Sequence, residues 1–343
     1  MSNRTEISTL GEFGLIRHLT DRIEIKNNST IKGVGDDAAI LSYEDRQVLV
    51  TTDLLLEGIH FDLTYVPLKH LGYKSAVVNF SDIYAMNGQP KQITVSLGIS
   101  KRFSVEDVED FYAGLKLACD VYGVDIVGGD TSASLTGLCI SITCIGEGER
   151  DKVVLRSGAQ ETDLICVSGD LGAAYMGLQL LEREKRIFKG EKDFTPDFTG
   201  KEYLLERQLK PEARKDIIEM LRHAGIIPTA IMDISDGLSS ELLHISKESN
   251  VGCRVYEDRI PIDYQTAAMA EQFNMNLVTA ALNGGEDYEL LFTVPLTDHD
   301  KVSEMKGVKV IGHITKPDLG NYLVGRDGGE VELKAQGWNS LEE

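Results

Sequence analysis

The sequence predicts an α/β protein with two domains. Its 343 residues exceed the usual size of one domain, and 42% of them are hydrophobic, which is enough for a substantial core. Stretches of alternating apolar residues, typical of strands, are interleaved with stretches of helical periodicity. A polar segment at residues 148–163 separates two such series. We therefore expect an N-terminal domain of residues 1–149 and a C-terminal domain of residues 150–343.

The first series begins with a strand at residues 48–50. This strand runs into Thr51, Thr52 and Asp53, and the three polar side chains interrupt its apolar character. Residues 67–88 then show a helical pattern that begins near a proline and stops at a glycine. The predicted order is a strand followed by a helix.

The first series continues with the alternating strand QITVSLGI, residues 92–99. A helix then opens with the capping-box pattern from Ser104 to Asp107. Two more strands follow, at residues 125–130 and 138–148. These elements predict a mixed α/β domain.

The second series starts with the strand LICVSGD, residues 164–170. The charged stretch 182–202 contains few apolar residues and predicts an exposed loop or a frayed helix extension. The remaining elements are helices near 211–223 and 276–282, a turn and helix over 231–250, and strands at 288–294, 308–314 and 321–334. Glycine-aspartate turns in both series hint at two related halves without demonstrating a repeat.

Charge and cysteine content limit the classes of function. The net charge of −20 argues against general affinity for nucleic acid or anionic membranes, so an anionic substrate must meet local cations. The polar N-terminus and the absence of a long apolar stretch indicate a cytoplasmic protein. Five cysteines without a C-x-x-C pair indicate neither a disulfide framework nor a zinc ribbon.

Aspartates gather at predicted strand ends, in turns and on largely apolar elements. Any one Gly-Asp pair is most simply a turn, but the set is large: Asp36, Asp37, Asp53, Asp82, Asp130, Asp233 and Asp236. In an α/β sheet, loops at the carboxyl ends of strands converge on one crevice, where so many carboxylates would need a cation. Oxygen ligands from Asp and Thr favour Mg²⁺ shared with substrate phosphates. The pattern therefore favours phosphoryl transfer.

The familiar nucleotide-binding motifs are missing from the sequence. It contains neither the P-loop G-x-x-x-x-G-K-S/T nor the H-R-D kinase loop. Phosphate must then be held mainly through metal ions, with the Gly128-Gly129 backbone and a cation such as Arg156 beside it. Arg156 could equally form a structural salt bridge. Taken alone, His60, Glu286 and Trp338 are more simply structural residues.

Eight segments together resemble thiamine-monophosphate kinase, a family of the aminoimidazole ribonucleotide synthetase superfamily, whose members bind ATP without a P-loop. They are GEFGLI (11–16), GVGDDAAI (33–40), TTDLLLEGIHF (51–61), NFSDIYAMNGQP (79–90), GGDTS (128–132), RSGA (156–159), MDISDGL (232–238) and GGEDYELLF (284–292). The short motifs are individually weak, whereas their order and spacing are specific. Ser132 stands where relatives commonly have threonine, and it preserves a hydroxyl.

The resemblance implies roles for residues at the matching positions. The magnesium ligands would be Asp37, Thr51, Thr52, Asp53, Asp82, Asp130, Asp233 and Asp236. Tyr112, Gly129, Arg156 and Ser235 would contact ATP, and His60, Glu286 and Trp338 would bind thiamine monophosphate. No residue is assigned as a general base, because the acceptor phosphate is already ionised at neutral pH, its second pKa being near ~6.

The resemblance also implies the fold and the reaction. Several Mg²⁺ ions would support direct in-line transfer of the γ-phosphoryl group of ATP to thiamine monophosphate, giving thiamine diphosphate. The N-terminal sheet would pair with that of a second copy to form a barrel in a homodimer, with a C-terminal α/β domain beyond it. Two alternatives stay open: an ATP-dependent ribonucleotide ligase or synthetase of the same superfamily, and a non-catalytic nucleotide- and metal-binding scaffold.

Overall fold

A computed structural model describes residues 18–20, 23–32, 40–43, 45–188 and 198–335. The chain divides into two compact units. Unit 1 comprises residues 1–83 and 88–151, and unit 2 comprises residues 84–87 and 152–343. Across the described ranges, none of the helices is both long and apolar enough to cross a membrane.

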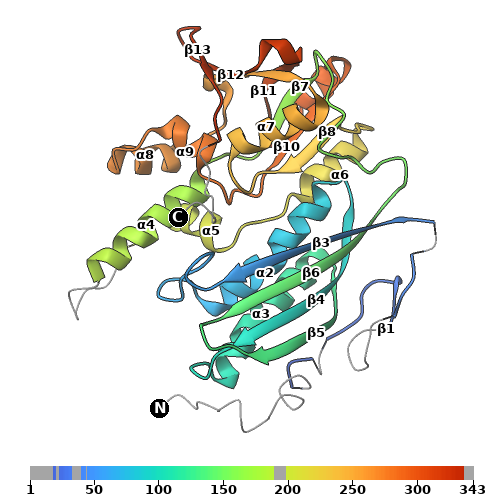
Figure 1. Cartoon of the computed structure of the whole chain (residues 1–343), viewed down its shortest axis with the longest axis vertical. Helices are drawn as coiled ribbons and strands as arrows, with labels where there is room; N and C mark the ends of the chain where they lie inside the picture. Colours follow the sequence, from blue (N-terminus) through green and yellow to red (C-terminus); the bar gives the residue numbers. More distant parts are fainter. Residues whose placement is uncertain (1–17, 21–22, 33–39, 44, 189–197, 336–343) are drawn as a thin grey trace. The chain divides into compact units, whose positions relative to one another are not determined.

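Unit 1 is built on a four-stranded mixed sheet in the order β3-β6-β4-β5. The strands are β3 (Gln47–Leu56), β4 (Gln89–Ile99), β5 (Asp125–Ala133) and β6 (Cys139–Gly148). β6 is antiparallel to both of its neighbours, and β4 and β5 are parallel. Helices α2 (Leu68–Tyr84) and α3 (Val105–Tyr122) cover one face of this sheet (Figure 1). A separate pair of short strands, β1 (Thr30–Lys32) and β2 (Ile40–Leu41), precedes it.

Alternation along β3 separates a helix-covered face from an open face. Leu49 and Leu55 are buried, whereas Val48, Val50 and Leu54 are 48%, 66% and 53% exposed. The strand pairs with β6 along its whole length without a bulge. The prediction that polar residues 51–53 interrupt the strand is therefore wrong, because alternating polar and apolar side chains suit a sheet with one open face.

The same difference occurs in β5. This strand continues to Ala133, so Asp130 lies within it and does not end it. Parallel pairing with β4 extends through residue 133 and supplies hydrogen bonds for the polar segment. Asp233, in contrast, is the last residue of the strand β8 (Ala230–Asp233), which the predicted turn and helix over 231–250 did not include.

Two glycines allow α2 and α3 to pack closely. A Cβ on Gly72 would lie 1.9 Å from the Phe111 carbonyl oxygen, and one on Gly114 would lie 1.7 Å from that of Lys69. The predicted capping box at the start of α3 is confirmed, since the Ser104 hydroxyl accepts from Asp107 N and the Asp107 carboxylate accepts from Ser104 N. The close backbone contact therefore holds α2 against α3, and the capping box fixes where α3 begins.

Unit 2 contains a seven-stranded sheet in the order β13-β12-β9-β11-β7-β10-β8. The strands are β7 (Leu164–Ser168), β8 (Ala230–Asp233), β9 (Gly252–Tyr256), β10 (Leu290–Val294), β11 (Val308–Thr315), β12 (Asn321–Val324) and β13 (Glu330–Glu332). Every residue of β7, β8 and β10 is buried, which explains their continuous apolar sequences. Within this sheet, β9 and β12 pair in parallel, and the other described pairs are antiparallel.

Unit 2 also contains seven α-helices among its described residues, and buried side chains of several of them form an apolar cluster. The helices are α4 (Ala173–Phe188), α5 (Glu202–Leu209), α6 (Lys215–His223), α7 (Leu238–Ser249), α8 (Tyr264–Gln272), α9 (Leu277–Asn283) and α10 (His299–Ser303). The charged stretch 182–202 was predicted to be either an exposed loop or a helix extension. Its first part, residues 182–188, is an extension of α4. Strand β9 and helix α8 were not predicted, because their sequences lack clear alternation or an apolar stripe.

Candidate functional site

In unit 1, the structure brings Thr51, Asp53 and Asp82 together. Thr51 and Asp53 share the helix-covered face of β3, and Asp82 projects from α2. The Thr51 hydroxyl donates to Asp82 Oδ2 at 2.5 Å. Burial, reinforced by the negative charge of Asp82, raises the pKa of Asp53 to about 6. Two carboxylates and a hydroxyl therefore form a polar site that a cation would stabilise.

Thr52 and Asp130 lie on the opposite, open face of the same sheet. Thr52 pairs with Thr143, and its hydroxyl donates to the Ile142 carbonyl oxygen at 3.1 Å. Asp130 is exposed and pairs with Ser96 at the other edge of the sheet. The expected gathering of all unit 1 ligands in one place is therefore not seen within a single copy of the sheet, because strand alternation turns Thr52 away from Thr51 and Asp53.

The other predicted residues of unit 1 occupy separate positions. Gly129 makes a close backbone approach, since a Cβ there would lie 2.0 Å from the Val95 carbonyl oxygen. Burial raises the pKa of Tyr112, which lies in α3, to about 12. His60 follows β3, and its Nδ1 accepts a hydrogen bond from Leu56 N at 3.0 Å. Asp37 lies outside the described residues.

In unit 2, residues 234–237 form a turn between β8, which ends at Asp233, and α7. Asp233 is buried, and Asp236 is exposed. Glu241, from the first turn of α7, closes the turn: its Oε1 accepts from Ser235 N at 3.1 Å and Asp236 N at 2.8 Å. Burial raises the pKa of Glu241 to about 7 despite these hydrogen bonds. Glu241 was not predicted as a site residue; its local signal in the sequence is that of an acidic residue in the first turn of a helix, which is favourable there whatever the turn before it does.

The loop that carries Glu286 is joined to this turn. Glu286 N donates to the Ser235 carbonyl oxygen at 2.7 Å, and Tyr288 N donates to that of Ile234 at 2.9 Å. These bonds continue the antiparallel pairing of β8 with β10 beyond the strand ends. The backbone of the Glu286 loop is thus held against the turn that carries Ser235 and Asp236.

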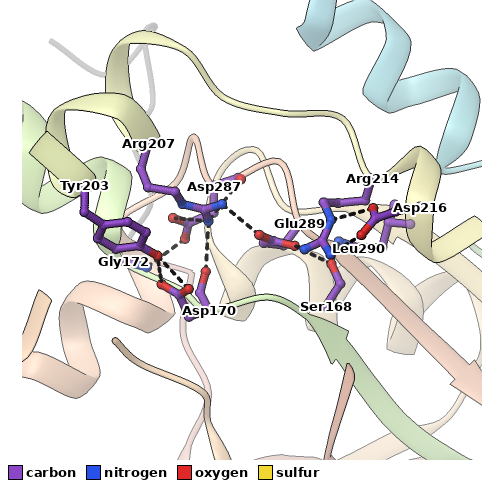
Figure 2. Close-up of polar contacts among 10 residues, drawn as sticks. All are labelled: Ser168, Asp170, Gly172, Tyr203, Arg207, Arg214, Asp216, Asp287, Glu289 and Leu290. Atoms are coloured by element: carbon purple, nitrogen blue, oxygen red, sulfur yellow. Dashed lines mark hydrogen bonds and ion pairs between the residues drawn. The ribbon is translucent and has the colours of Figure 1, made fainter. Parts of the chain in front are cut away.

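A buried charge network, which was not predicted from the sequence, lies beside this loop. Arg207 and Arg214 approach the Glu289 carboxylate from two sides (Figure 2). The Arg207 Nη1–Glu289 Oε1 distance is 2.8 Å, and the Tyr203 hydroxyl donates to Asp170 Oδ2 at 2.6 Å. The bonded partners are 33 to 82 positions apart in the sequence and share no motif, so their pairing could not be predicted from the sequence.

Burial also acts on Asp287 in this network. It raises the pKa of Asp287 to about 7, although Arg207 opposes the rise. The Asp287 Oδ2 atom accepts from Gly172 N at 2.9 Å. Asp287 is therefore tied to the segment that leads into α4, and it connects the Glu286 loop to the rest of unit 2.

Two predicted residues of unit 2 remain. Arg156 is exposed, and its carbonyl oxygen accepts from the Ser249 hydroxyl at 3.4 Å. Trp338 lies outside the described residues.

A cleft of about 450 Å³ is lined by Asn283, next to the Glu286 loop, and by Leu333 and Lys334 near the end of the described chain.

The donor atoms of unit 1 fit a hard cation. Thr51, Asp53 and Asp82 offer only oxygen, and Mg²⁺ is commonly held by one or two carboxylates together with substrate phosphates. Among the described residues, no group of three or more His, Cys, Asp or Glu side chains is placed to hold a metal ion. The described donors of unit 1 are thus two carboxylates and one hydroxyl.

Comparison with known proteins first defines the class. The family described as AIR synthase related protein, N-terminal domain, matches residues 35–147. The whole chain is 34% identical to a solved structure described as AaThiL complexed with AMPPCP and TMP, with a TM-score of 0.75 and coverage of 99% of this chain and 100% of that one. The fold is thus that of the AIR synthase-related proteins.

Curated relatives then identify the particular family. The chain is 37% identical to the thiamine-monophosphate kinase of Aquifex aeolicus, covering 91% of this chain and 97% of the relative. It is 31% identical to that of Bacillus subtilis, covering 96% and 99%. The chain belongs to the thiamine-monophosphate kinase family, and it is an enzyme of the kinase class.

Proposed function

We propose that this enzyme transfers the γ-phosphoryl group of ATP directly to the phosphate of thiamine monophosphate, giving thiamine diphosphate and ADP in a Mg²⁺-dependent reaction. The grouping of Thr51, Asp53 and Asp82 carries the proposal, because it is an oxygen-rich, partly buried site suited to a metal-phosphate complex. Family membership supports the choice of substrates, since a relative was solved with AMPPCP and TMP.

The residues divide by chemistry into three sets. We assign Mg²⁺ binding to Asp37, Thr51, Asp53, Asp82, Asp130, Asp233 and Asp236, with Thr52 as a further member whose hydroxyl is already bonded on the open face. Tyr112, Gly129, Arg156 and Ser235 contact the nucleotide. His60, Glu286 and Trp338 bind thiamine monophosphate.

The two reacting groups are both anionic phosphates, so charge repulsion between them is the main barrier to their approach. When bound, Mg²⁺ neutralises phosphate charge and aligns the reacting groups. Asp53 and Asp82 hold position through burial and through the Thr51 hydroxyl, and their ionisation is favoured once a cation is near. Gly129 admits phosphate close to the backbone. No base is required, because the acceptor phosphate is ionised at neutral pH.

We also propose that the enzyme is a homodimer in which two four-stranded sheets close a barrel. The open face of β3 presents Val48, Val50 and Leu54, which are at least 48% exposed in a single copy. Closure would pair the edge strand β3 of one copy with β5 of the other. That pairing would bring the strand that carries Asp130 next to the strand that carries Asp53 of the partner copy, with Asp130 on the open face and Asp53 on the helix-covered face.

The decisive experiment mixes the purified protein with ATP, Mg²⁺ and thiamine monophosphate and follows thiamine diphosphate by chromatography. We expect product that disappears when Mg²⁺ is chelated. Nucleotide binding without product would support a scaffold, and turnover of formylglycinamidine ribonucleotide instead would support a ligase. Inversion at a chiral γ-phosphorus is expected for direct transfer, whereas retention would indicate a phosphoenzyme.

A further inference from the structure

The loop containing Glu286 has a backbone that needs support from its surroundings. Gly285, Glu286 and Tyr288 have positive φ angles of 68°, 57° and 51°. Non-glycine residues adopt such conformations at a cost in free energy, and they persist where neighbouring structure holds them. The contacts around this loop therefore decide where the Glu286 carboxylate lies.

The turn after β8 supports one side of the loop. It accepts the backbone hydrogen bonds from Glu286 N and Tyr288 N. The packing is close, because a Cβ on Gly285 would lie 2.6 Å from the Ser235 carbonyl oxygen. These contacts fix the path of the backbone, but they leave the long Glu286 side chain to be oriented by another element.

Helix α5 supplies that second support through Gln208. The Gln208 side chain is buried, and its Nε2 donates to Glu286 Oε2 at 2.8 Å. An amide that donates to one carboxylate oxygen restricts rotation of the carboxylate and of the side chain that bears it. Gln208 thus orients Glu286 before any ligand arrives.

Arg207, the neighbour of Gln208, ties α5 to the residues that follow Glu286. Its guanidinium pairs with Glu289 at 2.8 Å and lies 3.7 Å from Asp287 Oδ1 (Figure 2). It also donates to the Asp170 carbonyl oxygen at 2.9 Å. The planar guanidinium bonds in two directions at once and fixes the end of α5, and therefore Gln208, relative to the loop.

We propose that Gln208 and Arg207 are positioning residues that orient the Glu286 carboxylate toward the thiamine part of the substrate. This inference rests on the proposed function, in which Glu286 binds thiamine monophosphate. A carboxylate can accept from the aminopyrimidine amine or pair with the thiazolium cation, and neither group takes part in phosphoryl transfer. The contact therefore stabilises the ground state and the transition state alike, and its loss raises KM without lowering kcat.

The first test replaces the Gln208 amide with a side chain of similar size, Gln208→Leu. We expect KM for thiamine monophosphate to rise about tenfold, with kcat and KM for ATP within about twofold of the wild-type values. Leu204→Ala is the matched control, because Leu204 is buried in the same helix and belongs to a separate apolar cluster. It should lower the thermal midpoint and leave KM for thiamine monophosphate unchanged.

The second test asks whether Gln208 acts through Glu286. In a Glu286→Ala background, Gln208→Leu should produce no further rise in KM. Arg207→Lys keeps the charge but lacks the fork, so we expect it to raise the same KM. An unchanged KM in Gln208→Leu, or additive effects in the double variant, would overturn the inference while wild-type product formation still supports the proposed function. Absence of thiamine diphosphate from the wild type would reject the proposed function itself.

Discussion

Asp53 and Asp82 lie close enough on the helix-covered side of the N-terminal sheet for each to disfavour the charge on the other. Burial contributes most to the raised pKa of Asp53, and the Asp82 charge adds to it. A site of this kind costs stability in the absence of a cation and becomes favourable when one binds. Stability and activity should therefore respond in opposite directions to loss of the charge.

The substitution Asp53→Asn tests this trade-off. We expect formation of thiamine diphosphate to fall about 100-fold or more, because a metal ligand is lost while side-chain volume is preserved. The thermal midpoint should stay the same or rise, since a disfavoured charge is removed. Product assays and thermal unfolding of the same preparation measure both effects.

Asp151→Asn serves as the control for that experiment, because Asp151 is exposed and belongs to none of the three sets of residues assigned to magnesium, nucleotide and thiamine monophosphate. It should change neither quantity. Near-normal activity in Asp53→Asn would remove Asp53 from the site.

At the scale of elements, Glu241 connects the first turn of α7 to the turn that carries Ser235 and Asp236. Its pKa is raised from 4.5 to about 7, chiefly by burial. The folded state therefore binds this proton more tightly than the unfolded chain does. The resulting stability is present below about pH 4.5 and is lost as pH rises toward about 7.

Glu241→Gln should remove this pH dependence, because the amide oxygen can still accept from the turn and no charge forms. The free energy of unfolding of the wild type should fall by up to about 3 kcal/mol relative to the variant between pH 4.5 and 8. Denaturant titrations across that range measure the difference. Glu248→Gln, at an exposed position of the same helix, should follow the wild type, and parallel curves for wild type and Glu241→Gln would contradict the assignment.

The packing of α2 on α3 depends on a second local feature, the absence of a side chain at Gly114. Gly114→Ala would place a Cβ 1.7 Å from the Lys69 carbonyl oxygen, so the helices must separate. We expect a loss of about 3 kcal/mol in unfolding free energy. In the control Gly128→Ala, the nearest atom to the new Cβ is a Thr94 methyl at 3.8 Å, and the loss measured by denaturant unfolding should be much smaller.

At the scale of the whole molecule, the open face of the N-terminal sheet predicts assembly. Val50 is 66% exposed on this face, so Val50→Asp should leave a single copy folded while placing a charge inside the proposed barrel. We expect a dimer for the wild type and a monomer with greatly reduced activity for the variant, measured by light scattering and product assay.

Leu135→Asp is the matched control, since Leu135 is fully exposed but lies outside the sheet. It should remain dimeric. A wild-type protein that is monomeric at all accessible concentrations would contradict the barrel, whatever the variants do.

Sequence reasoning located most elements of the sheet and helix layers, because their periodicity follows directly from which faces are buried. The capping box at Ser104 and the turn after Asp233 were predicted correctly from local signals. The prediction that Asp53 and Asp130 end their strands was wrong. Hydrogen bonds to the neighbouring strands continue past both residues, although the local sequence there is polar and looks like a strand end. Element boundaries depend on partners that are distant in sequence.

The sequence by itself determined the family, the α/β class and the residue types available for metal and phosphate, since these depend on composition, order and spacing along the chain. Only the tertiary structure decided that Thr51 faces Asp82 while Thr52 faces away, and that Arg207 and Gln208 support the segment from Glu286 to Glu289. These contacts join residues that are 31 or more positions apart. They depend on which face of a strand each side chain occupies and on how the helices pack, and the local sequence does not specify the packing.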